Sequence, residues 1–215
     1  SSGWFEADPQ TQFEVVMGAT VLPALSDIDP ANFLPSSRSV AFLKEAWQAV
    51  GGYPEWLDYS EDLVFDMALQ ERYGQFAFAP RAVAYFRPRG DLRVFGRQYY
   101  LYARGDGKAD LWPKRHAIRY LTYLIGLPLI VRWIFSGRLI GWFALLVGGG
   151  IYCRRPAQRL WPKTRLWTPW ARAGGLALIP LLRLVGDMAK MIGYPVGRIW
   201  RHKNRPPAQG PRGQA

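Results

Sequence analysis

Hydrophobic and polar residues are arranged differently in the two halves of the chain. Before Asp110 the apolar residues come in short groups between polar turns, which predicts short helices and strands. Beyond Trp112 the apolar runs lengthen. Residues 117–135 are interrupted by charge only at two arginines, and residues 139–153 carry no charge. The pattern therefore predicts a mixed α/β first half and a second half of apolar helices.

Four helices are expected in the first half, each beginning after a capping residue or ending at a glycine or proline. They cover residues 9–22, 44–50, 61–72 and 92–103. Asp8, Ser60 and Asp91 are the expected N-caps of the first, third and fourth helices. Short strands are expected at residues 39–42, 76–78 and 82–86, which are too few for a complete sheet.

The two long apolar runs are joined by Ser136–Gly137, which predicts a tight turn. Crossing a bilayer takes about 20 apolar residues, so the second run is short and the first is interrupted by charge. We expect a helical hairpin over residues 117–153 that dips into one leaflet or just crosses the membrane. A buried helical pair in a soluble protein is the alternative.

Two further segments follow the hairpin. Residues 176–200 are apolar on one side and charged on the other, which favours an interfacial amphipathic helix over a span. Residues 201–215 are rich in proline, glycine and arginine, and we expect a disordered basic tail. The predicted organisation is a domain over residues 1–112, membrane-associated helices over 113–200, and the tail.

The charge distribution favours a membrane as partner. The chain has 28 Lys+Arg against 16 Asp+Glu, a net charge of +12, and beyond Asp110 the only carboxylate side chain is Asp187. The basic residues flank apolar runs, so anionic lipid is a better partner than nucleic acid, for which no binding motif is present. Basic residues at both ends of the hairpin predict the cytoplasmic face of the plasma (inner) membrane.

Cysteine content and the first residues add little about function. Cys153 is the only cysteine, so no intrachain disulfide can form, and we expect an inert buried thiol. The chain opens at Ser1 without an initiator methionine or a signal peptide. We therefore expect a piece of a longer protein.

The strongest candidate for chemistry is the acidic pair Glu61–Asp62 at the start of the third expected helix. Acids in a first helical turn complement the positive end of the helix dipole, so plain capping is one interpretation. A positioned general base is the other, since a carboxylate is ionised at neutral pH and accepts a proton at short range.

The surroundings of this pair resemble family 2 glycosyltransferases with the GT-A fold. Matching stretches occur in the family's order and spacing between about residues 4 and 112. They are PSSRSVAF (35–42), AVGGYP (49–54), EDLVFD (61–66), FAFAP (76–80) and RQYYLYARGDG (97–107). The resemblance implies an α/β fold, a partial GT-A (Rossmann-like) glycosyltransferase domain, followed by the α-helical membrane-associated region.

The resemblance also implies a role for each matching position. Asp62 would be the catalytic base that deprotonates the acceptor hydroxyl in an inverting displacement. Glu61 and Gln98 would bind the acceptor, and Arg97 and Arg104 would contact the departing diphosphate. The spacing from Gln98 to Arg104 is longer than in processive relatives and no Trp follows, so both arginines have the alternative of solvating a helix face.

The family holds Mg²⁺ or Mn²⁺ through an Asp-x-Asp motif after a buried strand, and we find no such motif here. Asp27–Ile28–Asp29 matches the Asp-x-Asp pattern, but it follows Pro23 and lies in an expected loop. His116 and His202 lack partners at metal-ligand spacing. No metal site is therefore expected in this chain. Without the nucleotide-binding half, we expect residues 1–215 alone to be inactive.

The resemblance thus implies a glycosyltransferase that moves a sugar from a nucleotide-sugar donor to a sugar or lipid-linked acceptor, in cell-envelope or polysaccharide/glycolipid synthesis. Membrane lipids are the other expected partner. The alternative is a non-catalytic, membrane-anchored module derived from such an enzyme, which binds a glycan or a protein. An intact Glu61–Asp62 pair argues for the enzyme.

Overall fold

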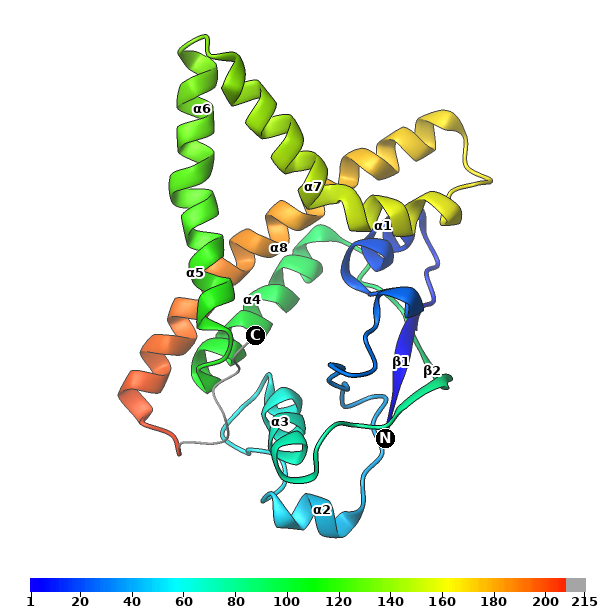
Figure 1. Ribbon diagram of the computed structural model, residues 1–215, viewed down its shortest axis with the longest axis vertical. Coiled ribbons are helices and arrows are strands. Elements are labelled where there is room, and N and C mark those ends of the chain that lie inside the picture. The colour runs from blue at the N-terminus through cyan, green and yellow to red at the C-terminus, as the bar shows by residue number, and fades with distance from the viewer. Residues whose placement is uncertain (208–215) are drawn as a thin grey trace.

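Helices make up most of the computed structural model, which describes residues 1–207 (Figure 1). Its two strands are β1 (Ser2–Ala7) and β2 (Phe78–Phe86). Between them lie α1 (Gln12–Val21), a 3₁₀ turn η1 (Leu25–Asp27), α2 (Lys44–Ala49) and α3 (Glu61–Tyr73). After β2 come α4 (Leu92–Ala109), α5 (Pro113–Leu121), a π-helical turn η2 (Thr122–Gly126), α6 (Leu127–Phe135), α7 (Leu139–Lys163) and α8 (Pro169–Asn204).

The two strands form a small parallel sheet. Ser2 pairs with Phe78 and Ala7 with Phe86, and the indole nitrogen of Trp4 donates to the carbonyl of Pro80 at 2.9 Å. The expected strands at 76–78 and 82–86 are a single strand, because Pro80 lies within β2 and does not end it. The expected strand at 39–42 reduces to one bridge between Val40 and Ser2. Strand β1 was not predicted from the sequence.

The predicted fold class, an α/β domain with a partial Rossmann-like GT-A core, is therefore wrong for the described residues. A Rossmann-like domain has several parallel strands with helices on both faces, whereas residues 1–207 contain one two-stranded sheet. The physical reason lies in the core. The main apolar cluster is built between helices, with Val16, Phe95, Leu160 and Leu182 in contact across α1, α4, α7 and α8.

Close packing of α8 on α4 forms the centre of this helical arrangement. The α8 residues that face α4 include Gly186, Gly193 and Gly197, and a Cβ at Gly193 would lie 2.2 Å from the carbonyl oxygen of Tyr100. Small residues of this kind let two helix backbones approach each other. The side of α8 that was expected to face a membrane interface is thus partly covered by α4 and α1.

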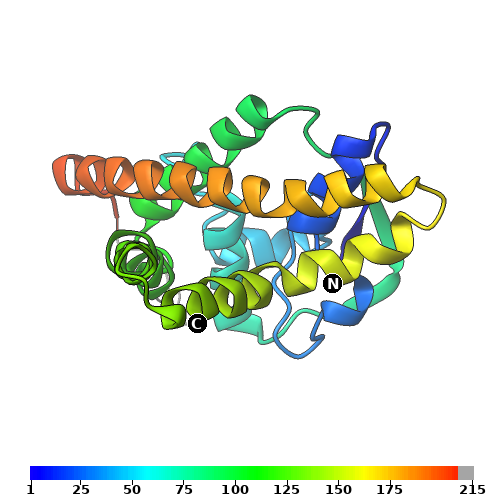
Figure 2. The ribbon, with the colours of Figure 1, turned by 90° about the horizontal axis from the view of Figure 1, so that it is seen from above.

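The predicted hairpin is present and projects away from the rest of the chain (Figure 1). Helices α5 and α6 run on through η2, and the turn before α7 contains Gly137 with φ of 69°. In the view turned by 90°, the first arm is seen nearly end-on and α8 crosses the molecule past both arms (Figure 2). The second arm is longer than expected, since α7 continues to Lys163.

The first arm of the hairpin, Pro113–Phe135, is long and apolar enough to cross a membrane. It is the one helix of residues 1–207 that meets this criterion, and the rest of the described chain leaves its apolar stretch uncovered. Phe135 at the tip is 86% exposed and Leu146 in the second arm is 71% exposed.

Several helix ends differ from those predicted. Helix α1 is capped by the hydroxyl of Thr11, which accepts from the amide of Glu14, in place of Asp8. Helix α4 keeps its predicted cap at Asp91 but continues to Ala109. Helix α8 extends to Asn204, into the segment expected as a tail. The remaining tail residues, 208–215, lie outside the described part of the chain.

Candidate functional site

The N-terminus of α3 is held against α4 by direct contact. Ser60 has φ of 65°, and its hydroxyl donates to Oδ1 of Asp106 at 3.0 Å instead of capping its own helix as predicted. Gly105 makes the contact close, since a Cβ there would lie 2.5 Å from the carbonyl oxygen of Tyr59. The start of α3 is thus fixed relative to α4.

A salt bridge ties the same loop to α4. One carboxylate oxygen of Asp58 accepts from Nζ of Lys108 at 2.6 Å, and the other pairs with the guanidinium of Arg104. Burial by itself would raise the pKa of Asp58, but the hydrogen bond and charge of Lys108, with the charge of Arg104, hold that pKa below its usual value. Arg104, predicted to contact a diphosphate, is instead paired with a carboxylate.

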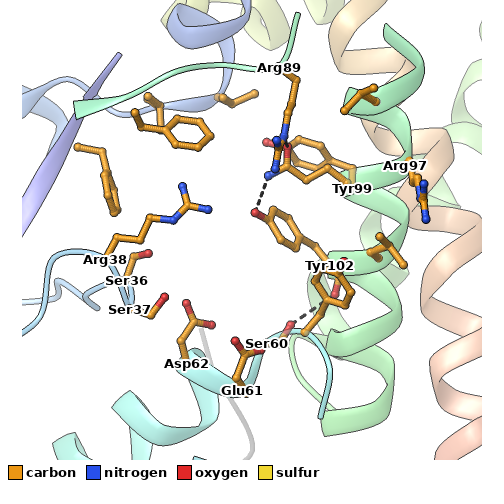
Figure 3. Close-up of a pocket in the computed structure, with 18 of the residues that line it drawn as sticks. Ser36, Ser37, Arg38, Ser60, Glu61, Asp62, Arg89, Arg97, Tyr99 and Tyr102 are labelled. Atoms are coloured by element: carbon orange, nitrogen blue, oxygen red, sulfur yellow. Dashed lines mark hydrogen bonds between the residues drawn. The ribbon is translucent and has the colours of Figure 1, made fainter. Parts of the chain in front are cut away.

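Glu61 and Asp62 occupy the first turn of α3 and face a cavity of about 600 Å³ (Figure 3). Oδ1 of Asp62 accepts from the backbone amide of Leu63 at 2.9 Å. This bond leaves the second carboxylate oxygen of Asp62 without a hydrogen-bond partner among the described residues. The carboxylate is therefore both oriented by its own helix and open toward the cavity.

Cations and polar groups line the other walls of this cavity. Arg38 extends toward its open middle, and Arg89 lies across from Arg38 on the segment that follows β2 (Figure 3). Nε of Arg89 donates to Oε1 of Gln98 at 3.1 Å, and Nε2 of Gln98 donates to the hydroxyl of Tyr102 at 2.5 Å. The cavity thus combines carboxylates on α3 with guanidinium groups opposite.

Asp66 lies behind this wall, one turn further along α3. It is 1% exposed, and neither carboxylate oxygen has a hydrogen-bond partner among the described residues. Burial, and after it the charge of Asp62, raises the pKa of Asp66 to about 7. A carboxyl group that is partly protonated near neutral pH therefore lies directly behind Asp62.

The cavity brings together four of the five predicted site residues. Glu61, Asp62 and Gln98 line it. Arg97 borders it, but its exposed side chain points away from the open middle (Figure 3), and Arg104 is not among the lining residues. Arg38 and Arg89, which also line the cavity, were not predicted as site residues from the sequence. Arg38 is the only cation of the PSSRSVAF stretch, so the family resemblance could have suggested a role for it. Arg89 follows a strand, and no pattern distinguished it from a turn residue.

No residues of the described part of the chain fit a catalytic metal. Residues 1–207 contain no group of three His, Cys, Asp or Glu side chains that could hold one. Asp27 accepts from Nε of Arg159 at 2.8 Å and Asp29 from Nδ2 of Asn32 at 2.7 Å, so both are engaged in the loop. His116 is buried, stacked on Tyr194 at 3.8 Å between ring centroids.

Comparison of the chain with protein-family models, with curated proteins and with solved structures finds no match. The resemblance to family 2 glycosyltransferases therefore remains a prediction from the sequence motifs.

Proposed function

We propose that this chain supplies the acceptor side of an inverting glycosyltransferase, with Asp62 as the general base. The observation that carries the proposal is the arrangement of the cavity, in which the open carboxylate oxygen of Asp62 shares one space with Arg38 and Arg89. A base for the acceptor proton and a cation for the developing negative charge both assist transfer of a sugar from a nucleoside diphosphate donor.

The reaction is a single displacement at the anomeric carbon. The acceptor oxygen forms a bond to that carbon, and its proton passes to the second oxygen of Asp62. The bond from the anomeric carbon to the diphosphate oxygen breaks on the opposite face, and its electron pair leaves with the diphosphate. Glu61 and Gln98, which line the same cavity, are proposed to hold the acceptor beside Asp62.

The arginines of the cavity are proposed to stabilise the leaving group. Guanidinium groups bind phosphate oxygens with two parallel hydrogen bonds, which makes them effective where negative charge develops. Arg38 and Arg89 take this role in place of Arg104, which is neutralised by Asp58. The guanidinium of Arg97 points away from the open middle of the cavity (Figure 3), so no contact with the leaving group is assigned to it.

Recognition of the donor's sugar and nucleoside, and any Mg²⁺ or Mn²⁺, belong to the proposal only as functions of groups outside the described residues. No side chains of residues 1–207 fit a metal, so no step is assigned to one.

The proposed location is the cytoplasmic face of the plasma (inner) membrane. The base of the hairpin carries six cationic residues, Lys114, Arg115, Arg119, Arg154, Arg155 and Arg159, and the region of its tip carries Arg132 and Arg138. Because cationic residues favour the cytoplasmic side, this imbalance supports a base in the cytoplasm, where nucleotide sugars are found. A second apolar surface is the exposed stripe on the outer side of α8, which is formed by Leu181, Leu184, Ile192, Val196 and Ile199.

The test is sugar transfer in membranes from cells that express the complete protein. Labelled nucleotide sugars are supplied one at a time, and incorporation into lipid or polymer is compared between wild type and Asp62→Asn. Loss of incorporation in the variant supports the proposal. Equal incorporation would remove Asp62 as the base, whereas incorporation by wild type no higher than in membranes without the protein would favour a non-catalytic module.

A further inference from the structure

The last turns of α8 lie directly against the end of α4. A Cβ on Gly197 would overlap the carbonyl oxygen of Arg104, and a Cβ on Gly107 would overlap the carbonyl oxygen of Tyr194. One glycine on each helix therefore allows the two backbones to touch. Trp200 follows Gly197 by about one helical turn, so its ring extends from a backbone position that this contact fixes.

Trp200 contacts the loop between α2 and α3. Its ring is stacked on that of Trp56, with the centroids 6.0 Å apart and the planes inclined by 7°. Nζ of Lys108 lies 4.6 Å from the ring centroid of Trp200 and donates to Oδ1 of Asp58 at 2.6 Å. Nη1 of Arg201 donates to the carbonyl oxygen of Lys108 at 2.8 Å. The end of α8 thus holds the loop directly at Trp56 and, through Lys108, at Asp58.

This loop forms a wall of the cavity that contains Asp62. All five residues from Asp58 to Asp62 line that cavity. On its inner side the loop is held by Leu57, which is 6% exposed and belongs to the apolar cluster with Val64 and Leu111. Trp56 packs against the same cluster and also stacks on Trp200. A displacement of the loop would therefore displace the carboxylates that follow it.

The turn from the loop into α3 depends on support from its surroundings. Ser60 has φ of 65°, in the left-handed region that residues with a side chain rarely adopt. Such a conformation persists only where the neighbouring contacts hold it. One of these is the hydrogen bond from Oγ of Ser60 to Asp106, and the others are those of the preceding loop with Lys108 and Trp200. Without the latter, we expect the turn to relax and Asp62 to shift.

We propose that Trp200 is a positioning residue for Asp62, so that the end of α8 forms part of the framework of the site. This inference rests on the proposed function, in which Asp62 is the base. Trp200 contacts no substrate. It acts through the ring of Trp56 and, together with Lys108, through the carboxylate of Asp58. The helical second half of the chain thereby orders a catalytic loop of the first half.

The test compares the complete protein in a neutral detergent with its Trp200→Ala, Trp200→Phe and Trp170→Ala variants. Hydrogen–deuterium exchange of the backbone amides of residues 56–63, with no donor present, measures how firmly the loop is held. Trp200→Ala should accelerate this exchange about tenfold through loss of the stacked pair. Trp200→Phe should restore most of the protection. Trp170→Ala is the matched control and should change nothing, because Trp170 lies on the same helix and is 87% exposed.

Sugar transfer is measured on the same proteins in membranes. Trp200→Ala should lower turnover about tenfold or more, because small displacements of a base are costly. Trp200→Phe should recover most of the turnover, and Trp170→Ala should keep the wild-type rate. Helix α1, which packs against the opposite end of α8, should exchange as in wild type in every variant (Figure 1).

Three outcomes would overturn the proposal. Unchanged exchange at residues 56–63 in Trp200→Ala would show that the stack does not hold the loop. Equal acceleration in α1 would reduce the effect to global stability. Wild-type turnover by Trp200→Ala with a loosened loop would show that Asp62 does not depend on it. Because the exchange measurement involves no transfer, its failure is distinct from that of Asp62 as a base, which the Asp62→Asn variant tests.

Discussion

The carboxyl group of Asp66 lies one helical turn beyond that of Asp62 on α3, buried and without a hydrogen-bond partner among the described residues. Burial and the charge of Asp62 together disfavour its ionisation. A second negative charge at this point would oppose the ionised Asp62 that the proposed mechanism needs. The protonated form of Asp66 therefore supports an ionised base in front of it.

Stability should fall with rising pH because of Asp66. Its pKa is about 7 in the folded chain and about 3.9 in an unfolded one. Between these values the folded state binds a proton that the unfolded state has lost, so stability declines from about pH 4 to pH 7 and then levels off. Asp66→Asn keeps the shape of the neutral acid and should be more stable than wild type at pH 8 by about 1–3 kcal/mol.

Thermal unfolding at pH 5 and pH 8 measures this difference. The gain of Asp66→Asn over wild type should be larger at pH 8 than at pH 5. Asp29→Asn, which removes an exposed carboxylate in a loop, is the matched control and should show no such dependence. A gain of equal size at both pH values would contradict a raised pKa for Asp66.

Gly105→Ala should disturb the site by displacing the start of α3. The new Cβ would lie 2.5 Å from the carbonyl oxygen of Tyr59 and 2.7 Å from Oγ of Ser60, so the start of α3 must move away from α4. We expect a loss of about 1–3 kcal/mol in stability. We also expect sugar transfer to fall by up to about 10²-fold, since small displacements of a base are costly.

The matched control for Gly105→Ala is Gly174→Ala. Gly174 lies in α8 with no atom within 4 Å of the added Cβ, and alanine favours a helix. Unfolding temperature and transfer should be unchanged or slightly improved in the control. Transfer by Gly105→Ala at the wild-type level would show that the contact does not position Asp62.

The hairpin should resist extraction from membranes by salt. High salt screens attachment through Arg159, Lys163 and Arg165, but it does not release apolar helices from hydrocarbon. Washing membranes with concentrated salt and then with carbonate separates the two cases. Complete release by salt alone would mean that α6 and α7 do not enter the bilayer.

Local signals in the sequence were sufficient for many of the elements. The glycines after α2, the Asp91 cap and the Ser136–Gly137 turn are short-range effects, and these features are present as predicted. The fold class was wrong because it depended on contacts between distant segments. Nothing in the sequence near Phe95 indicates that its neighbours are Leu160 and Ile179, which make the core helical.

In the candidate site, too, local features were predictable from the sequence and contacts between distant segments were not. Glu61 and Asp62 were predicted as site residues because they begin an expected helix within the stretches that resemble family 2 glycosyltransferases, and both line the cavity. Arg104 was predicted to contact the diphosphate, but its guanidinium pairs with Asp58, which lies 46 residues earlier in the sequence. Arg38 and Arg89 meet in one cavity only because β1, β2 and α4 converge there, and a single sequence does not encode that convergence in any local pattern.

The most direct measurement is the rate of sugar transfer by Asp62→Asn in membranes that contain the complete protein. Asparagine retains the shape of aspartate but does not take a proton from the acceptor, so turnover should fall by about 10²- to 10⁴-fold. Asp29→Asn should transfer sugar at the wild-type rate, and Asp62→Asn should unfold at close to the wild-type temperature. Near-normal transfer by Asp62→Asn would contradict the assignment of Asp62 as the base.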